Sequence, residues 1–351
     1  MDLLQLPIDR IPRRYVVRST PAPRWRSRLS AFAAAMLAAT PLAATPLLAV
    51  AQAWPQQAIR VIVPFTPAGG TDTLARLLSD RLAADNNWTL VVENRAGAGG
   101  NIGMEVVARA KPDGQTLAVG QTSNLAVNPT LFAKMPYDSP RDFTPIAFVA
   151  QQPLIVVVRE DAPYRTLAEL FAAAKAKPGA LNMASAATGT VGHLAGELLA
   201  RTAGFRITHI PYKGAAPALA DLIGGTVDFM LPSPPSVIPF IKQNRVRPLA
   251  VTSRDRLALL PDVPTIAESG FPGFEAVDWK VLVGPAGIPA DRVRILHDAV
   301  IRAVGNPDFK ARLAAEGSVP MSGSSEALGQ FIAAEVPRWG AVVKESGAKA
   351  E

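Results

Sequence analysis

The sequence predicts an α/β protein built as two lobes, each a mostly parallel sheet flanked by helices. Short apolar runs alternate with segments of helical periodicity from about residue 59 onward, a pattern typical of parallel sheets covered by helices. Two strand-to-helix turns, both rich in small and hydroxyl residues, lie far apart at 64–72 and 182–190. The 298 residues that follow position 53 are enough for two such lobes, each with its own core.

Residues 1–53 are predicted to be an export signal that is cleaved after Ala53. A basic run at Arg24–Arg28 precedes a stretch at 29–50 that Ala and Leu dominate, and Ala51-Gln-Ala53 matches the A-x-A cleavage pattern. Two prolines interrupt the apolar stretch, which disfavours a membrane anchor. Arg13-Arg14 loosely resembles a twin-arginine signal, but the general export route is favoured. We therefore expect the protein in the periplasm.

The basic character of the chain belongs mostly to this segment. Of 36 basic and 29 acidic residues, it holds seven arginines and two aspartates, which leaves 29 basic and 27 acidic residues and a net charge near +2. No basic stripe with interleaved aromatics remains, so nucleic acid is not an expected partner. The absence of cysteine excludes disulfides, thiolate metal sites and a cysteine nucleophile.

Each predicted element rests on a local pattern. In the first series, apolar runs predict strands, and leucines at 74, 77, 78 and 82 recur at helical spacing. The expected order is strand 59–64, helix 73–84, strand 89–93, helix 102–110 and strand 116–120. A proline-rich passage at 136–145 is expected to connect this series to the next.

The second series begins with the fully apolar strand 153–158. Helices are expected at 167–176, 190–202 and 215–223, and strands at 181–184, 227–231 and 246–253. After a proline-rich loop at 261–272, strand 279–283 leads into helices 290–304, 307–316 and 325–346. We predict one lobe from 54–150 with 277–351, and a second from 151–276.

The first strand-to-helix turn is predicted to hold an anion. An apolar strand from Val61 runs into a loop of small residues, followed at once by a helix. The start of a helix presents unsatisfied N–H groups and the positive end of the helix dipole, and glycines allow the backbone to approach a ligand. The candidate binding residues are Phe65, Thr66, Pro67, Ala68, Gly69, Gly70, Thr71 and Asp72.

The second turn is the candidate partner of the first in the other lobe. Its hydroxyl and N–H groups are suited to a second carboxylate or to the far side of the same ligand, although an ordinary helix cap at Thr190 is the alternative. Lys213, at the start of a third helix, is suited to attract an anion. Asp72 and Asp228 also suit capping. The candidates here are Ser185, Ala186, Thr188, Gly189, Thr190, Lys213 and Asp228.

Motifs for cofactors and catalysis are missing from the sequence. The glycines at 97–103 fail the dinucleotide pattern G-x-G-x-x-G because its third glycine falls on Ile102, so a structural turn is favoured there. No P-loop and no G-x-S-x-G elbow occurs. Histidines at 193, 209 and 297 lack the spacing of a helical metal site. We expect no cofactor, no metal and no catalytic residues.

Six segments in order resemble the Bug family, the substrate-binding receptors of tripartite tricarboxylate transporters. Any one of them is a weak signal, but together they are specific and cover essentially Trp54 to the C-terminus. They are 64–76, 92–103, 189–197, 209–219, 222–228 and 260–270.

The resemblance implies a type II-like periplasmic binding fold that closes on a ligand in a cleft between the lobes. The ligand would be a di- or tricarboxylate or an aromatic acid, held by residues at 65–72 and 185–190 and delivered to a permease with a large and a small subunit. We expect a monomeric, non-enzymatic receptor.

Two alternatives to a transport receptor stay open at this point. A receptor that feeds a membrane sensor would have the same binding site. An exported enzyme would need His193 beside a carboxylate and a hydroxyl. Ala68 and Ala186-Ala187 depart from the family pattern, where glycine or serine is common, and are expected to add methyl groups to the ligand surface.

Overall fold

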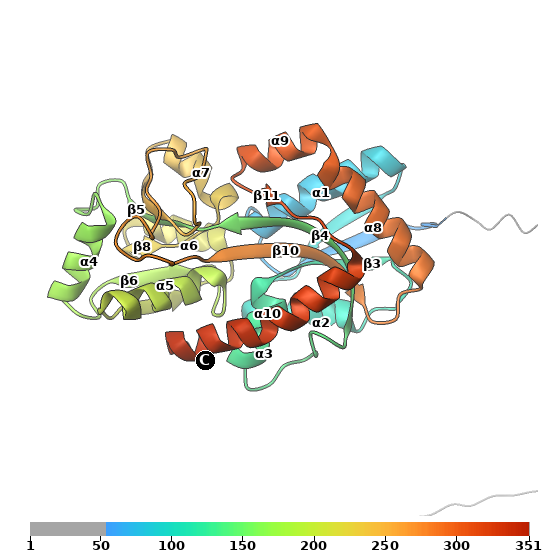
Figure 1. The fold of residues 1–351 in the computed structure, drawn as a ribbon, viewed down its shortest axis with the longest axis horizontal. Helices are drawn as coiled ribbons and strands as arrows, with labels where there is room; N and C mark the ends of the chain where they lie inside the picture. Colours follow the sequence, from blue (N-terminus) through green and yellow to red (C-terminus); the bar gives the residue numbers. More distant parts are fainter. Residues whose placement is uncertain (1–53, 351) are drawn as a thin grey trace, which may run out of the picture. The chain divides into compact units, whose positions relative to one another are not determined.

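The computed structural model describes residues 54–350, so the predicted export signal at 1–53 lies outside the described residues. Two sheets flanked by helices make up this part of the chain (Figure 1), as the α/β prediction requires. The first sheet has the order β11-β4-β10-β3-β1-β2 and the second β7-β6-β8-β5-β9.

The strands divide between the two sheets as follows. The first sheet contains β1 (Ile59–Val63), β2 (Leu90–Asn94), β3 (Thr116–Gln121), β4 (Phe143–Pro153), β10 (Val277–Pro285) and β11 (Val319–Pro320). The second contains β5 (Ile155–Arg159), β6 (Asn182–Ser185), β7 (Thr208–Pro211), β8 (Phe229–Met230) and β9 (Val246–Val251).

Both sheets are mixed but run mostly in one direction. In the first, β1 pairs in parallel with β2 and β3, and β10 lies antiparallel between β3 and β4. In the second, β6 pairs in parallel with β7 and β8, and β5 lies antiparallel between β8 and β9. Each sheet therefore has four strands pointing the same way, but five of the nine strand pairings are antiparallel, so the α/β prediction is confirmed with sheets that are mixed.

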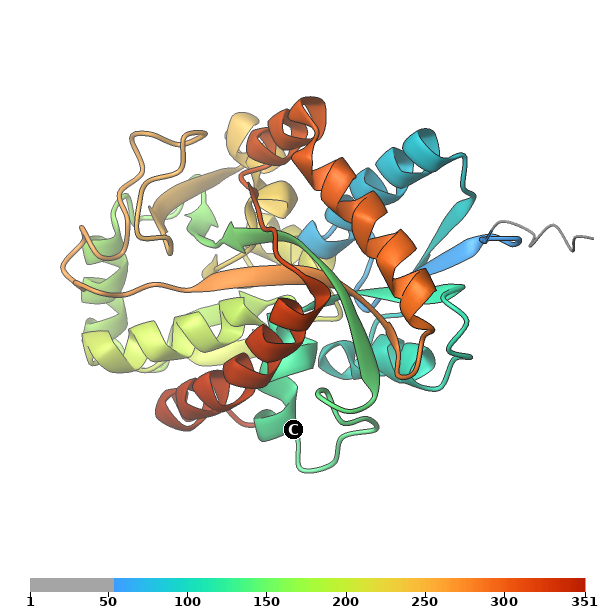
Figure 2. The ribbon, with the colours of Figure 1, turned by 45° about the vertical axis from the view of Figure 1, so that its right-hand side comes forward.

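Helices cover both faces of the first sheet (Figure 2). One face packs against α1 (Gly70–Asn86), α8 (Ala290–Gly305) and α9 (Pro307–Ala315) in a core of their own. The other face carries α2 (Asn101–Ala108), α3 (Asn128–Leu131) and α10 (Ser325–Ser346). Its core continues into α4 (Leu167–Ala176) and α5 (Val191–Ala203) of the second sheet. The C-terminal helix α10 therefore packs on both parts, not on the first alone.

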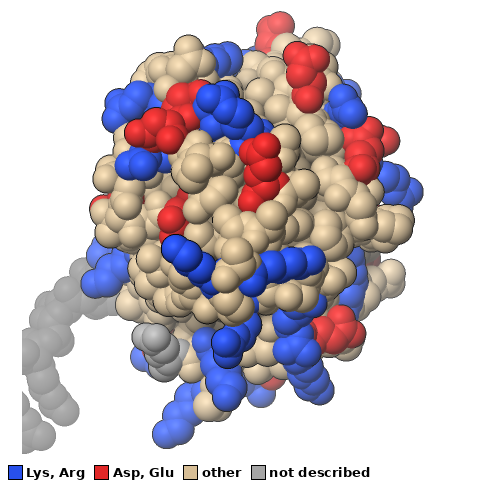
Figure 3. All heavy atoms as spheres, turned by 90° about the vertical axis from the view of Figure 1, so that its left-hand side faces the viewer, with Lys and Arg blue, Asp and Glu red and all other residues tan. Residues whose placement is uncertain are grey.

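The remaining helices α6 (Ala215–Gly224) and α7 (Pro234–Lys242) pack on the opposite face of the second sheet. Figure 3 views the molecule from the side that is on the left in Figure 1, where α4 lies. Lys and Arg side chains gather toward its lower edge, and charges of both signs are mixed above. Within residues 54–350, no helix combines the length and apolar character needed to cross a membrane.

Prolines explain two of the elements that the sequence patterns missed, β4 and α7. The passage at 136–145 was expected to be a connection, but its end starts the long strand β4, and Pro145 lies opposite Val283 beside a shift in register. A bulge tolerates proline because one ladder bond is already absent there. Similarly, α7 begins with Pro234, a first-turn position where the missing N–H costs nothing.

The chain passes between the two sheets twice, and the end of β9 lies beside both passages. Leu154 joins β4 to β5, Thr252 follows β9, and Ala276 precedes β10. Thr252 ties them together: its N–H donates to Leu154 O (2.9 Å), its Oγ1 accepts from Leu154 N (2.7 Å), and its carbonyl accepts from Ala276 N (3.0 Å). The division of the chain into lobes at 150/151 and 276/277 stays a prediction.

Candidate functional site

A pocket forms where the N-termini of four helices meet. Its lining includes the first residues of α1, α5 and α6 and the residue before α7, namely Gly70, Val191, Ala215 and Ser233. The first N–H groups of a helix have no partner within the helix, and its N-terminus carries a partial positive charge. No side chain caps α1, α6 or α7. The pocket is therefore suited to an anion.

The pocket is narrow. The space open to a water-sized sphere is about 60 Å³. A single water needs roughly 10–15 Å³ on this measure, so the described arrangement has room for a few waters or a compact molecule.

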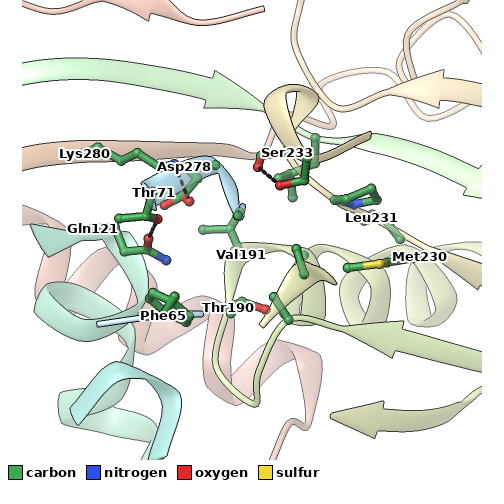
Figure 4. A pocket seen from close by; sticks show the side chains of 18 residues that line it. Phe65, Thr71, Gln121, Thr190, Val191, Met230, Leu231, Ser233, Asp278 and Lys280 are labelled. Carbon is green, nitrogen blue, oxygen red and sulfur yellow. Dashed lines mark hydrogen bonds and ion pairs between the residues drawn. The ribbon is translucent and has the colours of Figure 1, made fainter. Parts of the chain in front are cut away.

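Polar side chains gather at one side of this space (Figure 4). Thr71, Gln121, Asp278 and Lys280 lie together there. Thr71 Oγ1 donates to Gln121 Oε1, and Gln121 Nε2 donates to Ser123 Oγ at 3.0 Å. The Thr71 hydroxyl and the Gln121 amide are thus held in place by each other and by Ser123.

Lys280 and Asp278 form a buried ion pair in the lining, with 2.8 Å between Nζ and Oδ2. The exposed fractions are 1% for Lys280 and 7% for Asp278. They are alternate residues of β10, so both side chains lie on the pocket face of the strand. Trp279 between them points the other way, and its indole donates to Glu335 Oε2 at 2.8 Å.

Apolar side chains form much of the remaining lining. Met230 and Leu231 lie across the pocket from the polar group in Figure 4, with Ser233 near Leu231 and Val191 between the two sides. Leu154 and Phe65 also belong to the lining, and Phe65 lies below Gln121. A few polar groups at one end of a mostly apolar cavity are typical of a small-molecule site. Such a site orients a ligand with a charged end and a carbon body.

Both predicted loops reach this pocket. Four of the residues singled out in the first loop and two in the second line it: Phe65, Gly69, Gly70, Thr71, Ala186 and Thr190. The structure therefore brings together two loops that are more than one hundred positions apart in sequence, and their role in holding a ligand stays a prediction.

Asp72 does not line the pocket, because its carboxylate stabilises the loop itself. It accepts from Arg76 Nε (3.0 Å), Asn94 Nδ2 (2.9 Å) and Ala68 N (2.9 Å). Burial alone raises the pKa of Asp72, but these hydrogen bonds outweigh it and hold the pKa below its ordinary value. Thr66, Pro67 and Ala68 of the same loop are also absent from the lining.

Ala68 holds a left-handed backbone conformation, with φ of 62°. This region favours glycine, the residue that the resemblance led us to expect at this position. Its methyl group does not line the pocket, and neither does that of Ala187. Of the three alanines that were expected to place a methyl group on the ligand surface, Ala186 alone lines the pocket.

The remaining candidates are engaged elsewhere or exposed. Ser185 Oγ donates to Ala187 O at 3.0 Å, and Asp228 Oδ2 accepts from Asn182 N at 2.7 Å. Thr188, Gly189 and the exposed Lys213 are not part of the lining. Thr190 lines the pocket and also caps α5, since its Oγ1 accepts from His193 N at 3.3 Å.

Two histidines contact the second loop and hold its backbone and Ser185 in place. The rings of His193 and His209 stack with centroids 3.7 Å apart. His193 Nδ1 accepts from Gly189 N at 3.1 Å, and His209 Nε2 lies 2.7 Å from Ser185 Oγ. Burial lowers the pKa of His193 to about 3, with the neighbouring His209 contributing, and burial lowers that of His209 to about 4. Both rings are therefore neutral near pH 7.

His193 lies 3.9 Å from the Glu197 carboxylate, the type of neighbour that an exported enzyme would need. Neither histidine lines the pocket, however. Among residues 54–350 there is also no cluster of three or more His, Asp or Glu that could hold a metal ion.

Sequence patterns missed several pocket residues. Ser233 and Ser236 belong to the start of α7, which was not predicted. Gln121 is the last residue of β3, and the pairing of β3 with β10 places it beside Lys280 at the cavity. Asp278 and Lys280 did carry a signal, because charged residues at alternate positions in an otherwise apolar strand indicate one face with a polar environment.

Similar proteins support what the geometry indicates. A relative named "UPF0065 protein in tcbD-tcbE intergenic region", from Pseudomonas sp. (strain P51), is 40% identical over 84% of this chain and 87% of its own. "Protein BugT" from Bordetella pertussis is 37% identical over 85% of this chain and 92% of its own.

Three solved structures share the fold. R. palustris Rpa4515 with adipate is 36% identical, with a TM-score of 0.83 over 85% of this chain and 99% of that one. The periplasmic binding protein BugD is 33% identical, with a TM-score of 0.81 over 85% and 100%. MatC from Rhodopseudomonas palustris with bound malate is 34% identical, with a TM-score of 0.78 over 82% and 99%.

The two mixed sheets and the anion-suited pocket define a solute-binding receptor. The family described as "Tripartite tricarboxylate transporter family receptor" matches residues 74–348. The chain belongs to this family, which confirms the resemblance seen in the sequence.

Proposed function

We propose that this receptor binds a small carboxylate in the pocket between its two sheets and delivers it to a tripartite permease with a large and a small subunit. The convergence of four helix N-termini on one pocket carries the proposal, since their N–H groups and dipoles favour a negative charge. Adipate and malate are bound by the similar Rpa4515 and MatC.

The site residues of this proposal lie at the starts of α1 and α5, at or directly after the ends of the two predicted loops, and on β10. Backbone N–H groups at Gly70, Thr71, Val191 and Gly192 would hold the carboxylate, with Lys280 contributing positive charge. The parts around the two sheets would act as lobes, 54–150 with 277–351 and 151–276, that close by bending at Leu154, Thr252 and Ala276. Closure around a ligand is a common motion in two-lobed receptors.

We further propose that the working protein is a monomer exported to the periplasm after cleavage behind Ala53, and that it is not an enzyme. His193 and His209, the histidines that an exported enzyme could use, do not line the pocket, which supports reversible binding. Turnover of a bound acid by the purified protein would contradict this part of the proposal.

Ligand-induced stabilisation tests the proposal. The chain from Trp54 onward should be unfolded, freed of bound molecules, refolded and heated with carboxylic acids from two to eight carbons. Matched neutral amides serve as controls. At least one acid should raise the melting temperature in proportion to ln(1 + [L]/Kd), and its amide should not. Equal shifts with acid and amide, or none with any acid, would contradict carboxylate binding.

A further inference from the structure

The ion pair of Lys280 and Asp278 is an unusual component of an anion site. A lysine alone would complement a carboxylate, but here its charge is already compensated by Asp278 at 2.8 Å. Both side chains are buried in a cavity lined largely by apolar groups. Taking two charges out of water costs free energy that their mutual attraction does not always recover, so packing alone does not account for the pair.

Asp278 also has an acceptor that nothing in the described part of the chain satisfies. Its Oδ2 accepts from Lys280, but Oδ1 is buried and has no hydrogen-bond partner among residues 54–350. A carboxylate oxygen can only accept, and leaving a buried acceptor unpaired is unfavourable. Since Asp278 lines the pocket, a small shift of its side chain would bring Oδ1 within reach of a donor on a ligand.

The same geometry disfavours an unsubstituted acid. A ligand carboxylate close to Lys280 also lies close to Asp278, because the two side chains are in contact. Like charges at short range repel strongly in a low-dielectric site. A donor on the ligand carbon next to the carboxylate can offset this repulsion, because it donates a charge-assisted hydrogen bond to Asp278. Such a bond is stronger than one between neutral groups.

Resting on the receptor function proposed above, we propose that the pocket selects compact carboxylates that carry a hydrogen-bond donor, a hydroxyl or an ammonium group, on the carbon next to the carboxylate. The carboxylate lies between Lys280 Nζ and the helix N-termini, and the donor binds Asp278 Oδ1. The carbon body extends toward Met230 and Leu231 on the far side of the pocket (Figure 4).

Two matched series of acids test the proposal by titration calorimetry on the refolded chain from Trp54 onward. Propionate, lactate and alanine differ only in the group next to the carboxylate, as do succinate, malate and aspartate. In at least one series the hydroxyl or ammonium member should bind at least about tenfold more tightly than the unsubstituted acid, because a site that presents a buried polar group rejects ligands that leave it unpaired. Comparing the two substituted members identifies which donor is preferred.

The variant Asp278→Leu tests the role of the carboxylate, and the double variant Asp278→Leu with Lys280→Met guards against misfolding. Replacing a buried pair by apolar residues of similar volume is often tolerated, whereas removing one partner leaves a buried charge. In the double variant the preference for the donor should fall to about threefold or less. Glu93→Gln is the control, because it removes the ion pair with Arg60, 2.7 Å apart, outside the pocket lining.

Each outcome decides a different claim. Unsubstituted acids that bind as tightly as their hydroxyl and ammonium partners would overturn the donor selection and leave the receptor function intact. A preference that survives in the double variant would overturn the role of Asp278. Failure of all six acids, together with failure of every acid in the melting experiment, would overturn the receptor function and this inference with it.

Discussion

Gly70 allows the start of α1 to approach α7 at the pocket. A Cβ atom at this position would lie 2.2 Å from Ser233 Oγ, 2.9 Å from Gln152 Oε1 and 3.1 Å from Ser233 Cβ. Contacts this short force neighbouring atoms to move. Gly70 belongs to α1 on the first sheet, whereas Ser233 precedes α7 on the second. The absence of a Cβ atom at Gly70 therefore allows the two parts to approach each other at the pocket.

Gly70→Ala should lower ligand affinity roughly tenfold or more, since overpacking costs about 1–3 kcal/mol. The free energy of unfolding should change little, because alanine favours the helix. Adding Ser233→Ala should recover part of the affinity by removing the closest atom, and calorimetry on the two single variants and the double variant measures this coupling. Gly224→Ala is the control, because nothing lies within 4 Å of its added Cβ. Additive effects of Gly70→Ala and Ser233→Ala would contradict the contact.

The stacked histidines predict a loss of stability in mild acid. The pKa of His193 is about 3 and that of His209 about 4 in the folded protein, below the ordinary 6.5. The unfolded chain therefore takes up protons first, and stability falls as pH drops below 6.5. Between pH 7.5 and 5 each histidine should contribute a loss of roughly 2 kcal/mol. Glu197, whose pKa burial raises, faces His193 and opposes this trend.

Urea unfolding at the two pH values tests this prediction. The double variant His193→Asn with His209→Gln keeps an acceptor near Gly189 N and a polar group near Ser185 Oγ, but does not titrate in this range. It should lose less stability than the unaltered protein over the same interval. Equal losses in both proteins would show that the histidines are not buried as described.

At the scale of elements, α10 fixes the strand that carries the charged pair of the pocket. Trp279 of β10 and Trp339 of α10 both donate to Glu335 Oε2, at 2.8 and 2.9 Å, and Arg338 donates to Oε1 at 2.7 Å. Because Trp279 lies between Asp278 and Lys280, this buried network sets the face of β10 that the pair occupies.

Glu335→Ala should lower the free energy of unfolding by roughly 2–4 kcal/mol, because it leaves two buried indole N–H groups without an acceptor. Glu345→Ala, on the exposed side of the same helix, should change it by less than about 0.5 kcal/mol. Urea titrations followed by tryptophan fluorescence measure both. Similar losses in the two variants would mean that the network contributes little.

Local patterns predicted most elements but only part of the site. The helices α4 and α10 have the predicted bounds, since apolar spacing and caps such as Thr166 and Ser324 mark them clearly. The elements β4 and α7 were missed because prolines are normally read as breaks. The pairing of strands depends on contacts between segments that are distant in sequence. No local pattern therefore placed Gln121 or Lys280 beside Thr71.

At the scale of the whole described chain, the two parts touch at several points around the pocket. A Cβ on Gly99 would lie 2.9 Å from the carbonyl of Thr188, and one on Gly189 would lie 2.8 Å from Asn128 Oδ1. Glycines at these positions let the second loop pack closely against the segments around Gly99 and Asn128. If the two parts move as the proposed lobes, we expect a ligand to leave this narrow pocket when these contacts separate.

A crystal structure of the refolded chain from Trp54 onward, with its tightest-binding acid, would show directly whether one carboxylate is held by both loops. We expect a carboxylate within hydrogen-bond distance of backbone N–H groups at the starts of α1 and α5, beside Lys280, with both loops in contact with one ligand. An acid bound outside this pocket, or held by one loop alone with the other open to solvent, would contradict this expectation.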